Sequence, residues 1–114
     1  MPTTVYGIAN CDTVKRARAW LAEQRIDAVF HDFKKAGVPA EIDAWLATFG
    51  WELLLNRKGT TWRKLDASRR EAVIDAATAR AVMLAEPSVI KRPVIEWDSG
   101  ALTVGFDPSR WPPR

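Results

Sequence analysis

The chain contains a single cysteine, Cys11, in surroundings that favour a reactive thiol. An apolar run over residues 5–9 comes shortly before it, and residues 12–18 have the composition of a helix start. A residue at such a strand-to-helix junction faces unpaired helix N–H groups and the positive end of the helix dipole. This environment lowers the pKa of a thiol and stabilises the thiolate, which is the nucleophilic form.

A buried, unreactive thiol is the alternative, because free cysteines often pack as small hydrophobes. The neighbours of Cys11 are polar, since Asn10 precedes it and Asp12 and Thr13 follow it. Polar neighbours favour an accessible thiol, whereas the Asp12 carboxylate opposes the thiolate by like-charge repulsion. The residues alone therefore leave both interpretations open. Because no C-x-x-C pair is present, redox chemistry here must use one thiol, with an external thiol such as glutathione resolving the mixed disulfide.

The elements around Cys11 predict a βαβ unit. Residues 3–8 and 28–33 have strand composition, and residues 13–25 between them carry an apolar stripe that includes Val14, Ala17 and Leu21. Two strands joined in this way are expected to be parallel, with a right-handed crossover. The thiol then lies in the first strand-to-helix loop.

The rest of the chain predicts a helical stretch followed by a β-hairpin. The helical part is expected to contain a loop over 34–39, a helix opened by Pro39 and ended by Gly50, and a helical turn or buried connector over 51–55. An irregular stretch over 57–64 and two helices or one bent helix over 68–86 follow. Strands at 94–97 and 102–104 then form the hairpin, and a proline-rich tail with one helical turn covers 107–114. Ser68 and Glu71 have the spacing of a capping box. The fold class is therefore α/β, in the thioredoxin-like order βαβ…ββ, as a single domain over 1–114 with a helical insertion at about 39–86.

Size and composition restrict the class of protein. The chain has 114 residues, 47% of them hydrophobic, which suits one globular domain, and we expect a monomer. No apolar stretch is long enough to span a membrane, and the first residues do not resemble a secretory signal. With a lone cysteine, these features favour a cytoplasmic setting. We expect no metal site and no bound cofactor, since neither ligand spacing nor a phosphate loop is present.

Positive charge is concentrated in one segment. The net charge is only +3, but residues 57–70 hold six cations and one acid. The segment fits a solvated face, an anionic ligand or an acidic partner. Nucleic acid is not expected as a partner, because only one aromatic residue, Trp62, interrupts the basic segment and no nucleic-acid-binding motif is recognisable.

Three segments together resemble the family of glutaredoxin-coupled arsenate reductases and their Spx-type relatives. They are Tyr6-Gly7-Ile8-x-x-Cys11-Asp12-Thr13, Leu54-Leu55-Asn56-Arg57 and Ile90-Lys91-Arg92-Pro93-Val94. The resemblance covers roughly residues 4–107 and is greatest to a small branch proposed to be glutathione-dependent thiol reductases. It implies that Cys11 is the nucleophile, that Arg57 and Arg92 bind an anion, and that Pro93 is a cis-proline beside the sulfur. Asn10, next to the thiol, is included in the predicted site.

The resemblance implies three functions. The favoured one is a monothiol reductase with glutathione as co-substrate and glutaredoxin as a further partner. The second is arsenate reduction, which is disfavoured because the family's third arginine has no match near residues 105–108. The third is a non-enzymatic, Spx-like regulator that binds RNA polymerase, although such regulators commonly use the C-x-x-C pair that is absent here.

Overall fold

A computed structural model describes residues 2–112, which divide into two units. One unit comprises the described parts of Met1–Ala36 and Arg92–Arg114, and the other is Gly37–Lys91. The helical stretch expected at about 39–86 falls inside the second unit. Of the predicted proline-rich tail, residues 113–114 lie outside the described part. Within residues 2–112, no helix is long and apolar enough to cross a membrane.

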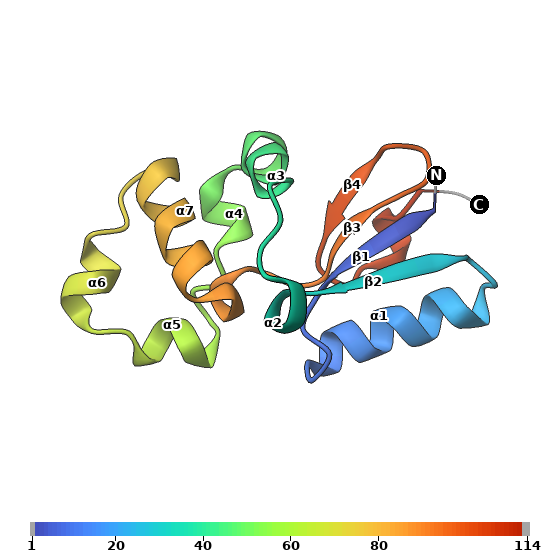
Figure 1. Ribbon diagram of the computed structural model, residues 1–114, viewed down its shortest axis with the longest axis horizontal. Coiled ribbons are helices and arrows are strands. Elements are labelled where there is room, and N and C mark those ends of the chain that lie inside the picture. The colour runs from blue at the N-terminus through green and yellow to red at the C-terminus, as the bar shows by residue number, and fades with distance from the viewer. Residues whose placement is uncertain (1, 113–114) are drawn as a thin grey trace. The chain divides into compact units, whose positions relative to one another are not determined.

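A four-stranded sheet with the strand order β2-β1-β3-β4 is the centre of the first unit (Figure 1). The strands are β1 Thr3–Gly7, β2 Ala28–Asp32, β3 Val94–Glu96 and β4 Leu102–Val104. β1 and β2 are parallel, while β1–β3 and β3–β4 are antiparallel. This arrangement confirms the predicted α/β class and the thioredoxin-like order, including the closing hairpin.

Helix α1, Asp12–Glu23, supplies the apolar stripe that its spacing predicts: Val14, Ala17 and Leu21 are all buried. Ala17 and Leu21 share a hydrophobic core with Val5 of β1 and Ile95 of β3, and two tryptophans complete it. Fully burying a side chain of leucine size contributes about 1.5–3 kcal/mol. This packing fixes α1 against the sheet, and with it the loop that carries Cys11.

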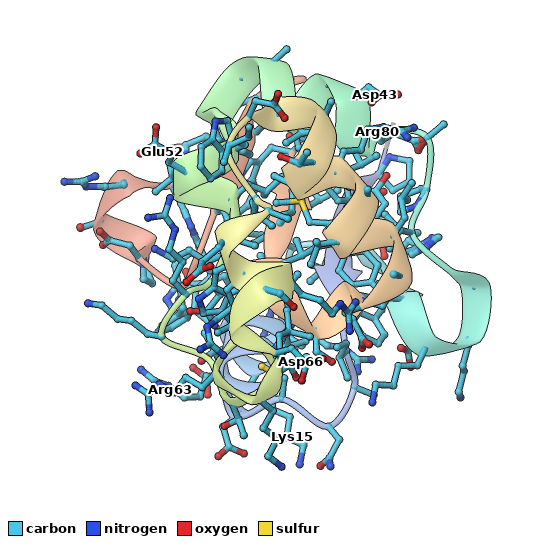
Figure 2. The ribbon with its side chains drawn as sticks, turned by 90° about the vertical axis from the view of Figure 1, so that its left-hand side faces the viewer. Lys15, Asp43, Glu52, Arg63, Asp66 and Arg80 are labelled. Carbon is cyan, nitrogen blue, oxygen red and sulfur yellow. The ribbon has the colours of Figure 1, made fainter. Side chains whose placement is uncertain are left out.

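The second unit is helical. Its elements are α3 Ile42–Phe49, α4 Trp51–Leu54, α5 Thr60–Lys64, α6 Ala67–Glu71, α7 Ala76–Ala85 and the 3-10 turn η1 Pro87–Val89. Ile42, Trp45, Leu54 and Met83 are fully buried. Figure 2 shows Arg80 of α7 beside Asp43 of α3, where the Arg80 Nε donates to the Asp43 carboxylate at 2.7 Å. Both side chains are exposed, so this ion pair adds little to stability.

Four local expectations from the sequence are wrong. Residues 34–39 are not all loop, because Phe33–Ala36 form the single-turn helix α2, where Asp32 Oδ1 accepts a hydrogen bond from the Lys34 N–H at 2.9 Å. Pro39 does not open a helix. Its carbonyl accepts a hydrogen bond from the Ile42 N–H in a turn, and α3 begins only at Ile42.

The third error is the irregular stretch at 57–64, which contains α5. The Arg70 guanidinium donates to the carbonyls of Arg63 and Leu65, seven and five residues earlier in the chain, at the C-terminal end of α5. Carbonyls at a helix end have no partner within the helix, so Arg70 satisfies groups that would otherwise need water. A contact of this kind is not visible in local helix propensity.

The capping box of this unit lies at Asp75 and Thr78, not at Ser68 and Glu71. Asp75 Oδ1 accepts from the Thr78 N–H at 2.9 Å, and Thr78 Oγ1 accepts from the Asp75 N–H at 3.1 Å. The Thr78 N–H and the Thr78 hydroxyl, which donates to Asp75 Oδ1 at 2.8 Å, hold the pKa of Asp75 below its usual value. Ser68 lies instead inside α6, after the N-cap residue Asp66.

Asp75→Ala is therefore expected to lower the melting temperature at pH 7, because α7 loses its N-terminal cap. Ser68→Ala is the matched control and should leave the melting temperature unchanged. Since folding lowers the pKa of Asp75, its contribution is present above the ordinary aspartate pKa of about 3.9 and is lost as the pH falls through the folded value. Equal melting temperatures for the two variants would contradict this assignment of the cap.

Candidate functional site

Cys11 is the N-cap residue of α1. Its backbone is extended, with φ −124° and ψ 122°, and its carbonyl accepts the first helical hydrogen bond from the Lys15 N–H at 2.9 Å. Its side chain is half-buried, so the thiol is neither a core residue nor fully solvated. Of the two interpretations that the sequence left open, the accessible thiol at a helix start is the one observed.

The pKa of the Cys11 thiol lies below its ordinary value. Burial raises the pKa, but this effect is outweighed by the backbone N–H of Val14, by the hydrogen bond and charge of the Arg92 guanidinium, and by the N–H of Thr13. The N–H groups do not reach the sulfur with the geometry of an ordinary capping hydrogen bond. They still favour the charged form, because their dipoles face a developing negative charge.

Asp12, which the sequence suggested would oppose the thiolate, is exposed. Its charge is screened by solvent, which weakens its repulsion of a neighbouring thiolate. Asn10 is also exposed, in the turn that leads into Cys11. Asn10 is the residue directly before Cys11 in the chain, and its role in binding stays a prediction.

Sheet pairing explains how Arg92 reaches Cys11 from 81 positions away in the chain. In the antiparallel pair of β1 and β3, Tyr6 lies opposite Val94, so the start of β3 is level with the end of β1. The chain enters β3 through Arg92 and leaves β1 toward Cys11, which brings the two side chains together. Arg92 is half-buried, and this location strengthens its interaction with the thiolate.

Pro93, between Arg92 and β3, is buried, and the Arg92–Pro93 peptide bond is cis, as predicted. The Pro93 carbonyl accepts a hydrogen bond from the Gly105 N–H at 2.9 Å, which ties this segment to the chain after β4. The closeness of the proline ring to the sulfur stays a prediction.

Arg57 belongs to the helical unit, between α4 and α5. Its guanidinium lies over the Trp51 ring, 5.2 Å from the ring centroid, and 3.8 Å from the Glu52 carboxylate. The side chain is 49% exposed, so the guanidinium can exchange the weak ion pair for another anion. Its participation at the Cys11 site stays a prediction.

Arg57 lines a pocket of about 370 Å³ within the helical unit. Arg57, Lys58 and Lys91 line it, with Asn56 and the single acid Glu52, beside Leu53 and Leu55. The Asn56 Oδ1 accepts from the Lys58 N–H at 3.2 Å and shapes the loop. Three cations against one carboxylate give a surface that suits a small anion.

Metal ligands and the single histidine are the other groups that could carry chemistry. Among residues 2–112, no three His, Cys, Asp or Glu side chains are grouped closely enough to hold a metal ion. His31 lies in β2 opposite Tyr6, with its ring 5.2 Å from the Tyr6 ring and 6.1 Å from that of Phe33. These contacts place the His31 ring in aromatic packing on β2.

Comparisons with known proteins find one matching family model and several similar chains. The ArsC family model matches residues 6–112. An uncharacterized protein from Haemophilus influenzae is 44% identical over 105 residues, which are 91% of this chain and 90% of that protein. A solved structure named YffB (PA3664) protein is 48% identical with a TM-score of 0.86, covering 94% of this chain and 93% of that one. The solution structure of an arsenate reductase (ArsC) related protein from Brucella melitensis is 55% identical with a TM-score of 0.74, covering 96% and 91%.

Proposed function

Because the chain belongs to the ArsC family, we propose that it is a monothiol, glutathione-dependent thiol reductase with Cys11 as its nucleophile. The observation that carries the proposal is the position of Cys11 as the N-cap residue of α1 next to Arg92, which lowers the pKa of its thiol. A lowered pKa increases the thiolate fraction at neutral pH, and the thiolate is the attacking species in disulfide exchange. The lone cysteine then requires an external thiol to complete each cycle.

The reaction consists of two thiol–disulfide exchanges. The Cys11 thiolate attacks the glutathione sulfur of a mixed disulfide between glutathione and a substrate thiol. The Cys11–glutathione disulfide forms, and the substrate leaves as a thiolate that takes up a proton. A second glutathione thiolate attacks the glutathione sulfur of this disulfide, which restores the Cys11 thiolate and releases oxidised glutathione. Each cycle therefore consumes one glutathione thiol, whose sulfur is oxidised to the disulfide level as the substrate sulfur is reduced to a thiol, and both glutathione units leave as oxidised glutathione.

Arginine side chains supply the positive charge that this chemistry needs. Glutathione carries two carboxylates, and a thiolate would repel them without nearby cations. A guanidinium binds a carboxylate through two parallel hydrogen bonds, which gives both strength and orientation. We assign this role to Arg57 and to the part of the Arg92 fork not directed at the sulfur, with Asn10 as a further polar contact.

Arsenate reduction is the competing activity, and the region after β4 argues against it. The only arginine near the position of the family's third arginine is Arg110, whose Nε lies 3.4 Å from the Asp107 carboxylate in the 3-10 turn η2, Pro108–Arg110. The side chain is 86% exposed and its charge is already partnered. An arsenate oxyanion would thus meet fewer free cations than the family pattern supplies.

The proposal is tested by treating the reduced protein with oxidised glutathione and analysing it by mass spectrometry. We expect one glutathione adduct, located on Cys11 and removed by reduced glutathione. Arsenate turnover with glutathione and glutaredoxin is measured in parallel and is expected to be weak or absent. Strong arsenate turnover would favour the competing activity. A protein that forms no adduct but retains RNA polymerase from a lysate would favour the regulator class.

Arg57→Ala is expected to slow formation of the glutathione adduct about tenfold, because one charge-assisted hydrogen bond contributes about 1.5–3 kcal/mol. Arg57→Lys should recover only part of the rate, since lysine keeps the charge but lacks the planar fork. Arg63→Ala, which removes an exposed cation from the same basic segment, is the control. Equal rates for wild type and Arg57→Ala would show that Arg57 is a surface charge.

A further inference from the structure

Gly7, the last residue of β1, is buried, and its φ lies outside the left-handed region. An alanine could therefore adopt the same backbone conformation. The reason for a glycine at this position must be space rather than backbone freedom, as is common where two backbone segments approach closely.

The side chain of Val14 in α1 occupies that space. An alanine Cβ at position 7 would lie 2.8 Å from Val14 Cγ2, 3.5 Å from its Cγ1 and 3.7 Å from its Cβ. A separation of 2.8 Å between two carbon atoms is far below van der Waals contact, so one of them must move. Val14 is fully buried, and a β-branched side chain in a helix has one strongly preferred rotamer. The first turn of α1 would have to shift instead.

This turn is part of the site. Cys11 is the N-cap residue of the same turn, and the backbone N–H groups of Val14 and Thr13 in that turn help to lower the pKa of its thiol. Val14 therefore packs against β1 through its side chain, while its backbone N–H is one of the groups that lower the pKa of Cys11. Any movement of Val14 away from β1 changes the direction of these N–H groups relative to the sulfur.

We propose that Gly7 is a positioning residue for the reactive cysteine: its missing side chain lets Val14 pack against β1, and this packing directs the first N–H groups of α1 at the Cys11 sulfur. The inference rests on the proposed function, since it concerns how the nucleophile is prepared. Gly7 itself touches no substrate and acts only through Val14.

A double-mutant cycle between positions 7 and 14 tests this. The rate of Cys11 alkylation by iodoacetamide is measured against pH in wild type, Gly7→Ala, Val14→Ala and the double variant. The pH at which the alkylation rate shows its inflection reports the pKa of Cys11. With Val14 present, the added methyl group is expected to raise this inflection pH and to slow alkylation at neutral pH about three- to tenfold. In the Val14→Ala background the same methyl group meets only a Cβ at 3.7 Å, an ordinary contact, and should change nothing.

Leu21→Ala is the stability control, because it opens a cavity in the core of the same helix further from the site. It should lower the melting temperature without moving the inflection. A folded Gly7→Ala protein with a wild-type inflection would overturn the proposal, and so would an equal shift with and without Val14. If Gly7→Ala does not fold, a double variant that folds and titrates like Val14→Ala supports the proposal, and one that also fails to fold overturns it. A wild-type inflection at or above about 8.5 would instead contradict the proposed function, while the coupling between the two positions could still be read.

Discussion

Replacing Cys11 by serine is expected to abolish adduct formation with oxidised glutathione and all glutathione-dependent reduction of a mixed-disulfide substrate. A serine hydroxyl is not ionised at neutral pH and cannot form the disulfide intermediate. Because the chain has no other cysteine, no second thiol can replace it. The measurement is intact-protein mass after glutathione treatment, together with turnover of a glutathionylated model peptide.

Cys11→Ser should otherwise leave the fold intact, since Cys11 is half-buried and serine is a good N-cap residue for α1. Its melting temperature and circular dichroism at neutral pH therefore serve as the control. Residual turnover in a folded Cys11→Ser protein would show that the reduction does not pass through this thiol.

Arg92→Ala is expected to raise the pKa of Cys11 and to slow adduct formation at neutral pH. The variant removes both a hydrogen bond to the sulfur and a neighbouring positive charge, two of the effects that lower the pKa. A hydrogen bond to a charged group contributes about 1.5–3 kcal/mol, and the partial exposure of Cys11 puts the loss near the lower limit, about tenfold in rate.

Arg92→Lys separates the two effects, because lysine keeps the positive charge but cannot reproduce the planar geometry. We expect an inflection pH between those of wild type and Arg92→Ala.

The same variants should also be less stable than wild type at alkaline pH. Folding lowers the pKa of Cys11, so the thiolate stabilises the native state fully above the ordinary thiol pKa, and this contribution is lost as the pH falls through the folded value. Identical pH profiles for all three proteins would remove Arg92 from the site.

The first unit of the fold could be predicted from the sequence because its signals are local and regular. The apolar stripe of Val14, Ala17 and Leu21 has helical spacing, and the strands on either side are rich in β-forming residues. Short crossover connections and a hairpin leave few possible topologies. The position of Cys11 at a helix start followed directly from these elements.

The helical unit was harder, because the ends of its short helices depend on individual side-chain hydrogen bonds that composition does not reveal. The cap of α5 by Arg70 and the cap at Asp75 are examples. Ser68 and Glu71 satisfied a spacing rule, but the chain placed them inside α6. Propensity and spacing indicate where a helix can form, whereas packing decides where it begins and ends.

The site was predictable only in part. The cis Arg92–Pro93 bond followed from the family resemblance and is confirmed, and the contact between Arg92 and Cys11 required the pairing of β1 with β3. The N–H groups of Thr13 and Val14 could not be assigned from side-chain identity, since every residue has one. Gly7 was visible in the sequence as part of a motif, but its close contact with Val14 is a property of the folded chain.

The activation of Cys11 as a thiolate is measured by the rate of its alkylation by iodoacetamide as a function of pH in the wild-type protein. The signal has one source, because Cys11 is the only thiol in the chain. We predict a single inflection clearly below the free-thiol value of about 8.5, since the helix start and Arg92 stabilise the charged form. An inflection at or above that value would show that Cys11 is not activated, because its thiol would then ionise no more readily than one in an unfolded chain.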